Sequence, residues 1–129
     1  MNAIALLSAG ALFGGMLFFT AVFAPLVFAH LDKEVAADLI RAVFPWYYLF
    51  VVATAVVGAL ALAPGGAWQG WVLAAVAGIA LAARQALLPA IVAAREAGSH
   101  RRFRALHRVS VAINIVQLAT AAIALAGLA

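Results

Sequence analysis

The side chains best suited to hold a ligand in this sequence are few, and they fall at one depth. They offer hydroxyl, amide and guanidinium groups, which hydrogen-bond polar or anionic molecules. When the long apolar segments are read as helices rising 1.5 Å per residue, these side chains lie about 10–16 Å inside one set of helix ends. The pattern predicts a substrate-binding layer in a cavity open to that side, made of Thr20, Thr54, Arg84, Gln85, Asn114 and Gln117.

Arg84 is the most demanding member of this layer. A cation well inside a bilayer costs at least about 2.5 kcal/mol, and none of the apolar segments contains a carboxylate. Arg84 must therefore extend to the membrane surface, pair with Asp38 or Glu96, or bind an anion. The neutral members have a structural alternative, because Thr commonly bonds its own backbone and Asn or Gln commonly joins two helices.

Histidines provide the other possible chemistry, since imidazole ligates copper and haem iron. The spacing of His30, His100 and His107 matches no metal motif, and the chain has no cysteine. We expect no cofactor, with haem or copper at His30 and His107 as the alternative. Hydrolase and nucleotide-binding motifs are absent from the sequence, so it offers no catalytic residues.

The elements that position these residues are membrane helices. Apolar residues make up 69% of the chain, charged residues 9%, and the mean hydropathy is +1.17. A bilayer crossing needs about 20 apolar residues. The sequence thus predicts a single domain over residues 1–129, an all-α antiparallel bundle of four transmembrane helices at Ala3–Ala29, Trp46–Ala63, Ala67–Leu88 and Val109–Leu128.

Two charged segments separate these spans. Residues 30–45 alternate apolar and charged side chains at helical spacing, which predicts a short interfacial helix that begins after Asp32 and is ended by Pro45. Trp46, Tyr47 and Tyr48 are then expected to form an aromatic belt at headgroup depth. The second segment, which begins at Arg95, is expected to be an arginine-rich loop.

Basic residues predict the orientation. Both charged connections fall on one side of the membrane and together carry Lys33, Arg41, Arg95, Arg101, Arg102, Arg104 and Arg108, while the other side has none. The positive-inside rule makes the charged side cytoplasmic and puts both termini outside, in a multi-pass protein of a bacterial inner membrane. The surplus positive charge then meets anionic lipid headgroups, and nucleic-acid binding is not expected.

Small residues at four-residue spacing predict close helix contacts. Gly10 and Gly14 form a GxxxG pattern, and the third span repeats Gly70, Ala74, Gly78 and Ala82. Small side chains let two membrane helices approach closely. We expect these faces to pack within the bundle or to join copies in a homo-oligomer.

Three motifs carry a family resemblance that covers almost the whole chain. They are GMLFFTAVFAP at Gly15–Pro25, FPWYY at Phe44–Tyr48, and FRALHRVS at Phe103–Ser110 with Asn114 following. They resemble the small four-helix membrane proteins that include transmembrane protein 205. The resemblance implies a polytopic membrane protein of unsettled function, and no catalytic residues are carried over. A more distant similarity is to copper-resistance membrane proteins and four-helix haem-biosynthesis oxidases.

Two functions of different classes remain. The first is a non-enzymatic membrane protein that binds or moves a small solute or lipid through a cytoplasm-facing polar cavity. The second is a membrane oxidoreductase or a haem- or copper-handling protein that uses His30, His107 and their neighbours. The absence of catalytic motifs favours the first.

Overall fold

The computed structural model describes residues 2–129, and every element in that range is a helix. The elements join into four rods, each long and apolar enough to cross a membrane. The all-α fold with four membrane-spanning helices is thereby confirmed. The rods consist of α1 (Ala3–Phe18), η1 (Phe19–Phe23) and α2 (Ala24–His30); α3 (Lys33–Leu62) and η2 (Ala63–Gly65); α4 (Trp68–Ala82), η3 (Ala83–Leu87) and α5 (Leu88–Glu96); and α6 (His100–Leu128).

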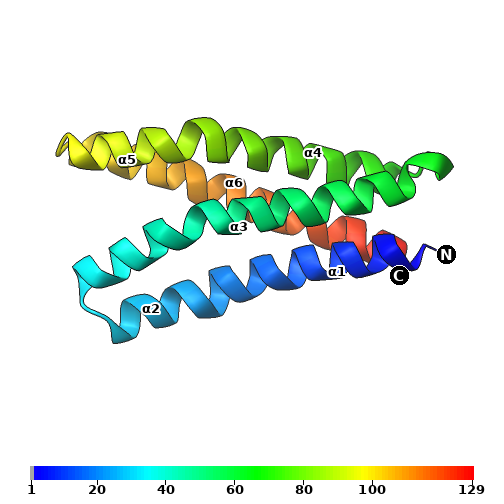
Figure 1. Cartoon of the computed structure of the whole chain (residues 1–129), viewed down its shortest axis with the longest axis horizontal. Helices are drawn as coiled ribbons and strands as arrows, with labels where there is room; N and C mark the ends of the chain where they lie inside the picture. The colour runs from blue at the N-terminus through cyan, green and yellow to red at the C-terminus, as the bar shows by residue number, and fades with distance from the viewer. Residues whose placement is uncertain (1) are drawn as a thin grey trace.

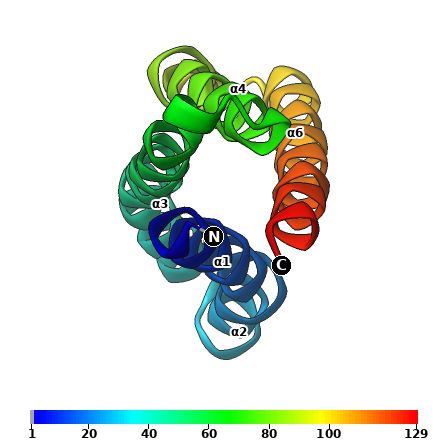
Figure 2. The same ribbon diagram turned by 90° about the vertical axis from the view of Figure 1, so that its right-hand side faces the viewer.

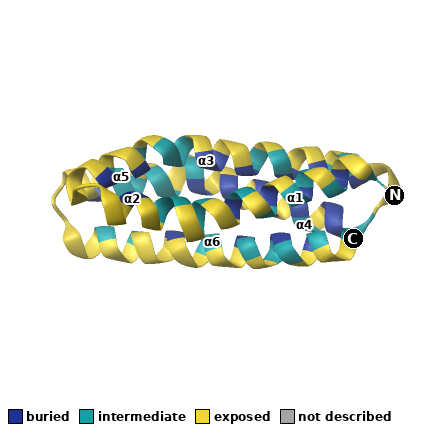
Figure 3. Cartoon of the chain, turned by 90° about the horizontal axis from the view of Figure 1, so that it is seen from below, coloured by how far each residue is buried: buried dark blue, intermediate teal, exposed yellow. Residues whose placement is uncertain are grey.

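The rods form a closed antiparallel bundle. α1 packs against α3 and α6, and α4 packs against the same two helices (Figure 2). Both termini lie at one end, which we call the terminal end (Figure 1). At the opposite end, which we call the charged end, the hairpin of α2 and α3 diverges from the hairpin of α5 and α6 (Figure 1). Figure 3 shows that few positions are buried at the charged end.

The prediction of a separate interfacial helix ended by Pro45 is wrong. α3 begins at Lys33 and continues through Pro45 to Leu62, and its first part is inclined to the rest (Figure 1). Proline lacks an N–H and crowds the preceding turn, so it bends a helix that packing holds together. The bend is braced from outside, because Arg84 Nε donates a hydrogen bond to the Pro45 carbonyl at 3.3 Å.

The arginine-rich loop is also helical, which corrects the second expectation. Arg95 belongs to α5, and residues 101–108 form the first turns of α6. The connection is a tight C-cap in which Ser99 N–H donates to the Ala94 carbonyl and Gly98 N–H to the Arg95 carbonyl, both at 3.1 Å. Gly98 has a φ of +71°, which glycine adopts without strain. Because arginine is a good helix former, α6 begins directly after this cap.

The two halves of the chain repeat one irregularity. A π-helical turn occupies η1 and another occupies η3, and Pro25 and Pro89 follow them at the same distance, with a step of 64 residues between each pair. Proline misfits a regular helix, and a π turn beside it absorbs the misfit. The buried positions of α1 recur in α4 with that same step, Ala5, Ala9, Leu12 and Met16 matching Gln69, Leu73, Val76 and Ala80. The first helices of the two hairpins thus have equivalent packing faces.

Close helix contact occurs at Gly70, one of the predicted glycines, and at Gly58, which was not predicted. A Cβ added at Gly70 of α4 would lie 3.1 Å from Leu62 Cβ of α3, and Gly70 is buried. A Cβ added at Gly58 of α3 would lie 2.8 Å from Leu73 Cδ1 of α4. A Cβ added at Gly10, Gly14 or Gly78 would meet no atom within 4 Å, apart from those of its own helix. Of the predicted small residues, Gly70 therefore packs inside the bundle, whereas Gly14, Ala74, Gly78 and Ala82 are exposed.

Candidate functional site

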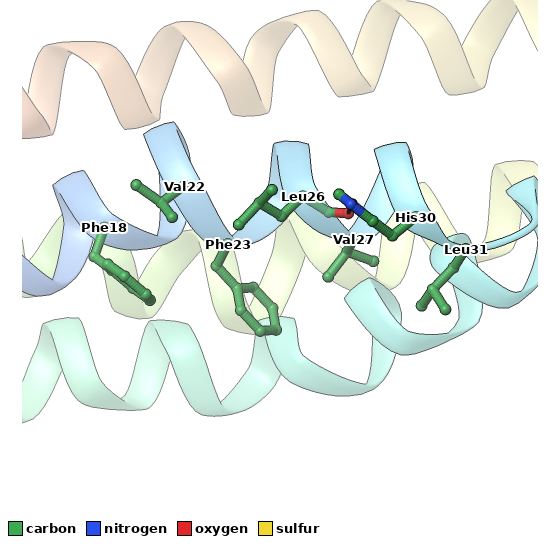
Figure 4. A pocket seen from close by; sticks show the side chains of 7 residues that line it. All are labelled: Phe18, Val22, Phe23, Leu26, Val27, His30 and Leu31. Atoms are coloured by element: carbon green, nitrogen blue, oxygen red, sulfur yellow. Dashed lines mark hydrogen bonds between the residues drawn. The ribbon is translucent and has the colours of Figure 1, made fainter.

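A shallow apolar groove of about 500 Å³ runs along the first rod towards the charged end. In Figure 4, Phe23 and Val27 are directed towards α3, and Val22, Leu26 and His30 lie on the other side of the rod. Leu26 is 51% exposed, so the groove is open at its side. We call this the α2 groove; it is lined by Phe18, Val22, Phe23, Leu26, Val27, His30 and Leu31.

A hydrogen-bonded cluster joins η1 to α3 and α6, and none of its three residues is among those that line the α2 groove. Asn114 Nδ2 donates to Thr20 Oγ1 at 2.9 Å, and the Tyr47 hydroxyl donates to Asn114 Oδ1 at 2.7 Å. These bonds tie η1, α3 and α6 together at one level. We call Thr20, Tyr47 and Asn114 the polar floor. Two members, Thr20 and Asn114, are among the six residues predicted from the sequence, and the structure brings them into direct contact.

Tyr47 belongs to the polar floor, although the sequence predicted it in the aromatic belt. It was expected at headgroup depth with Trp46 and Tyr48, but Tyr47 is 7% exposed and Tyr48 6%, whereas Trp46 is 72% exposed. Successive helix residues point about 100° apart, so one of three adjacent aromatics faces lipid while its neighbours face inward. The Tyr48 hydroxyl lies 3.3 Å from Ser110 Oγ. The hydroxyl of a buried tyrosine usually has a hydrogen-bond partner. A search for polar residues able to bond Tyr47 and Tyr48 could therefore have identified Asn114 and Ser110 from the sequence.

The other neutral members of the predicted layer lie outside the polar floor and, like Thr20 and Asn114, do not line the α2 groove. Gln117 is buried and its Nε2 donates to the Val76 carbonyl at 3.0 Å, which joins α6 to α4. Thr54 donates to the carbonyl of Phe50 in its own helix at 2.8 Å. Gln85 is exposed on the third rod. The structure therefore brings Thr20 and Asn114 of the predicted layer together, and it joins neither Gln117, Thr54 nor Gln85 to them.

Arg84 lies in η3 and is partly buried. Its Nε bonds the Pro45 carbonyl across the interface with α3. Within residues 2–129 the ion pair is Arg41 with Asp38 at 2.8 Å, so Arg84 pairs with neither Asp38 nor Glu96 there. The guanidinium thus braces the bend of α3 from the neighbouring hairpin.

The two candidate metal ligands stand on different helices at the charged end. His30 ends α2, and its Nδ1 lies 3.1 Å from the Leu26 carbonyl, to which it can donate. His107 lies in α6 with its ring stacked over that of Phe103, the centroids 6.1 Å apart. In the part of the chain that the structure describes, no three His, Cys, Asp or Glu side chains are grouped to hold a metal ion.

Comparison with known families gives one match. Residues 7–100 match the family described as "Domain of unknown function (DUF4149)". The matched range contains the whole α2 groove and two of the three residues of the polar floor, while Asn114 and most of α6 lie beyond it. No curated protein and no solved structure matched the chain.

Proposed function

This chain belongs to the DUF4149 family, and we propose that it is a non-enzymatic membrane protein that binds or moves a lipid of the cytoplasmic leaflet. The observation that carries the proposal is the α2 groove, a shallow apolar groove of the first rod that is open at its side near the charged end. A lipid chain is the molecule that fits an apolar surface with lateral access inside a bilayer.

The polar floor supports binding over conduction. Its amide and hydroxyl groups satisfy one another between helices, and they would have to separate before water or an ion could pass along the bundle axis. A conducting path needs polar groups free to replace the hydration of the permeating species. We therefore assign the floor a structural role: it holds η1, α3 and α6 together, and the predicted site residues Thr20 and Asn114 take part in it.

The orientation belongs to the same proposal. The seven basic side chains outside the apolar spans lie in α2–α3 and α5–α6 at the charged end, away from both termini. We assign that end to the cytoplasm of a bacterial inner membrane, where anionic headgroups meet the basic side chains. The groove then draws from the cytoplasmic leaflet.

The test fills the groove and measures the lipid that stays bound. Leu26→Trp places a large ring in the groove, and Leu60→Trp is the matched control, because Leu60 is an exposed apolar residue of α3 outside it. Both variants and the wild type are purified in the same detergent and examined by native mass spectrometry. Loss of retained lipid in Leu26→Trp alone supports the proposal. Equal retention by all three proteins overturns it.

A further inference from the structure

Two arginines lie at the charged end of the seam along which α3 packs against α4 and η3 (Figure 2). Buried residues of this seam repeat every seven positions, and such a repeat stays on one side of a packed helix. The repeats are Tyr48, Ala55 and Leu62 on α3, and Gly70 and Ala77 on α4. Continued towards the charged end, they lead to Arg41 on α3 and to Arg84 in η3.

One contact fixes the two helices at this level. Arg84 Nε donates to the Pro45 carbonyl at 3.3 Å, and Arg41 precedes Pro45 by about one helical turn. A Cβ added at Gly15 of α1 would meet the Phe50 ring, and Phe50 lies about 180° from Arg41 round α3. Arg41 is therefore turned away from the first rod, towards the edge that α3 shares with the second hairpin.

Gln85 marks the outer edge of the seam on the other helix. It is exposed and lies about 100° round the helix from Arg84. That turn leads away from Val76, whose carbonyl accepts a hydrogen bond from Gln117 of α6. Gln85 thus faces the surroundings of the bundle beside the seam. We call Arg41, Arg84 and Gln85 the seam site.

Arg84 lies at a depth where the surroundings are hydrocarbon. The exposed residues Trp68 and Trp71 begin α4 at the terminal end, and tryptophan favours the membrane surface. At about 1.5 Å per residue, Arg84 is about 20–24 Å from that surface. Since the hydrocarbon is about 30 Å thick, the Arg84 Cα is about 6–10 Å below the opposite surface, at the charged end.

The guanidinium of Arg84 has donors that the protein does not use. Of its several N–H groups, the one on Nε bonds a protein atom within residues 2–129. The one fully buried side-chain nitrogen or oxygen without a partner in that range is Arg41 Nε, so the terminal nitrogens of Arg84 are open to the outside. The Asp38 carboxylate already accepts from Arg41 at 2.8 Å. A cation with open donors at this depth requires an anion from its surroundings.

We infer that the seam site binds the phosphate of an anionic phospholipid from outside the bundle. The terminal nitrogens of Arg84 donate to the phosphate oxygens, with Arg41 and Gln85 beside them. Guanidinium groups form paired hydrogen bonds with phosphate, and a phospholipid is the source of phosphate within a bilayer. The acyl chains stay in the surrounding bilayer, so this site is separate from the α2 groove and goes beyond the proposed function.

The experiment compares Arg84→Leu with Arg102→Leu, which removes the same charge from an exposed position of α6. Wild type and both variants are purified in one detergent and mixed with phosphatidylglycerol or phosphatidylcholine of identical acyl chains. Bound lipids are counted by native mass spectrometry. A hydrogen bond to a charged group contributes about tenfold or more in affinity. We expect Arg84→Leu to reduce the preference for phosphatidylglycerol about tenfold and Arg102→Leu to leave it nearly unchanged.

Two further variants separate the phosphate contact from the brace at Pro45. Gln85→Leu leaves the bond between Arg84 and Pro45 in place, and it should reduce the preference about threefold, as expected for one neutral hydrogen bond. Arg84→Lys keeps the charge but cannot form the paired contact, so it should retain only part of the preference. If Arg84→Lys keeps the whole preference, charge alone acts and the phosphate contact is overturned.

Other outcomes also overturn the seam site. Equal loss in Arg84→Leu and Arg102→Leu would mean that general surface charge sets the preference. Displacement of the lipid by glycerol 3-phosphate at the same concentration would assign the site to a free anion.

The seam site and the α2 groove can fail separately. Leu26→Trp fills the groove and should leave the preference that depends on Arg84 intact. If Leu26→Trp removes that preference, the headgroup is held at the groove, so the seam inference fails and the proposed function stands. If Leu26→Trp retains every lipid while Arg84→Leu loses the preference, the proposed function fails and the seam site stands.

Discussion

Asn114→Ala is the substitution that tests the polar floor most sharply. Asn114 uses both ends of its amide, donating to Thr20 and accepting from Tyr47. Alanine removes both bonds and leaves the Tyr47 hydroxyl buried without its acceptor. Thr20 loses less, because a threonine in a membrane helix can turn its hydroxyl to its own backbone.

The size of the effect follows from those two bonds. Interhelical hydrogen bonds in membrane proteins average about 0.6 kcal/mol and reach about 1.7 kcal/mol. Two bonds give a loss of about 1–3 kcal/mol in the free energy of unfolding. Thr54→Val is the control, since Thr54 bonds its own helix and its loss should stay within about 0.5 kcal/mol.

The assay is reversible unfolding in mixed detergent micelles, run as a double-mutant cycle with Tyr47→Phe. We expect Asn114→Ala and Tyr47→Phe to be non-additive by about 0.6–1.7 kcal/mol, because they remove the same bond. Asn114→Ala and Thr54→Val should add. Additive losses for Asn114 and Tyr47 would refute the assignment of the floor as one hydrogen-bonded unit.

Three further predictions concern packing, the intramembrane cation and topology. Gly58→Leu should destabilise the bundle by about 1–3 kcal/mol or more, since the new leucine side chain must displace Leu73. Gly78→Leu places its side chain in open space and should change only the oligomeric mass in detergent. Equal losses of unfolding free energy in the two variants would contradict this packing. Arg84→Leu should leave the protein inserted and slightly more stable, because removing a cation from the bilayer outweighs one hydrogen bond to Pro45; a lower unfolding free energy than that of the wild type would show that the brace dominates. A carboxyl-terminal alkaline phosphatase fusion should be active, since seven basic residues hold the charged end inside; an inactive fusion with an active cytoplasmic reporter at the same point would reverse the orientation.

Hydropathy predicted the four spans, since crossing length is a property of the sequence alone. The ends of the helices were missed for a physical reason. Pro45 and the arginines after Gly98 carry local signals for a break, but packing holds Pro45 within α3, and the C-cap at Gly98 lets α6 restart at once. Local signals show where a helix can end, and neighbouring helices decide whether it does.

The site shows the same division. Depth measured along the sequence brought Thr20 and Asn114 to one level, because helical rise is regular. It could not show which face each helix turns to its neighbours, so Gln117 and Thr54 were grouped with them although they bond elsewhere. The two proline and π-turn pairs carry a signal that was available, the shared step of 64 residues from Pro25 to Pro89.

Photo-crosslinking tests the central claim, that a phospholipid chain occupies the α2 groove, most directly. The protein is placed in nanodiscs with a phosphatidylglycerol that bears a diazirine midway along one acyl chain, illuminated, and mapped by peptide mass spectrometry. The proposal predicts adducts concentrated on Phe18–Leu31, and their loss in Leu26→Trp. Adducts spread evenly over lipid-facing residues such as Leu60 and Ile123, and unchanged in that variant, would contradict it.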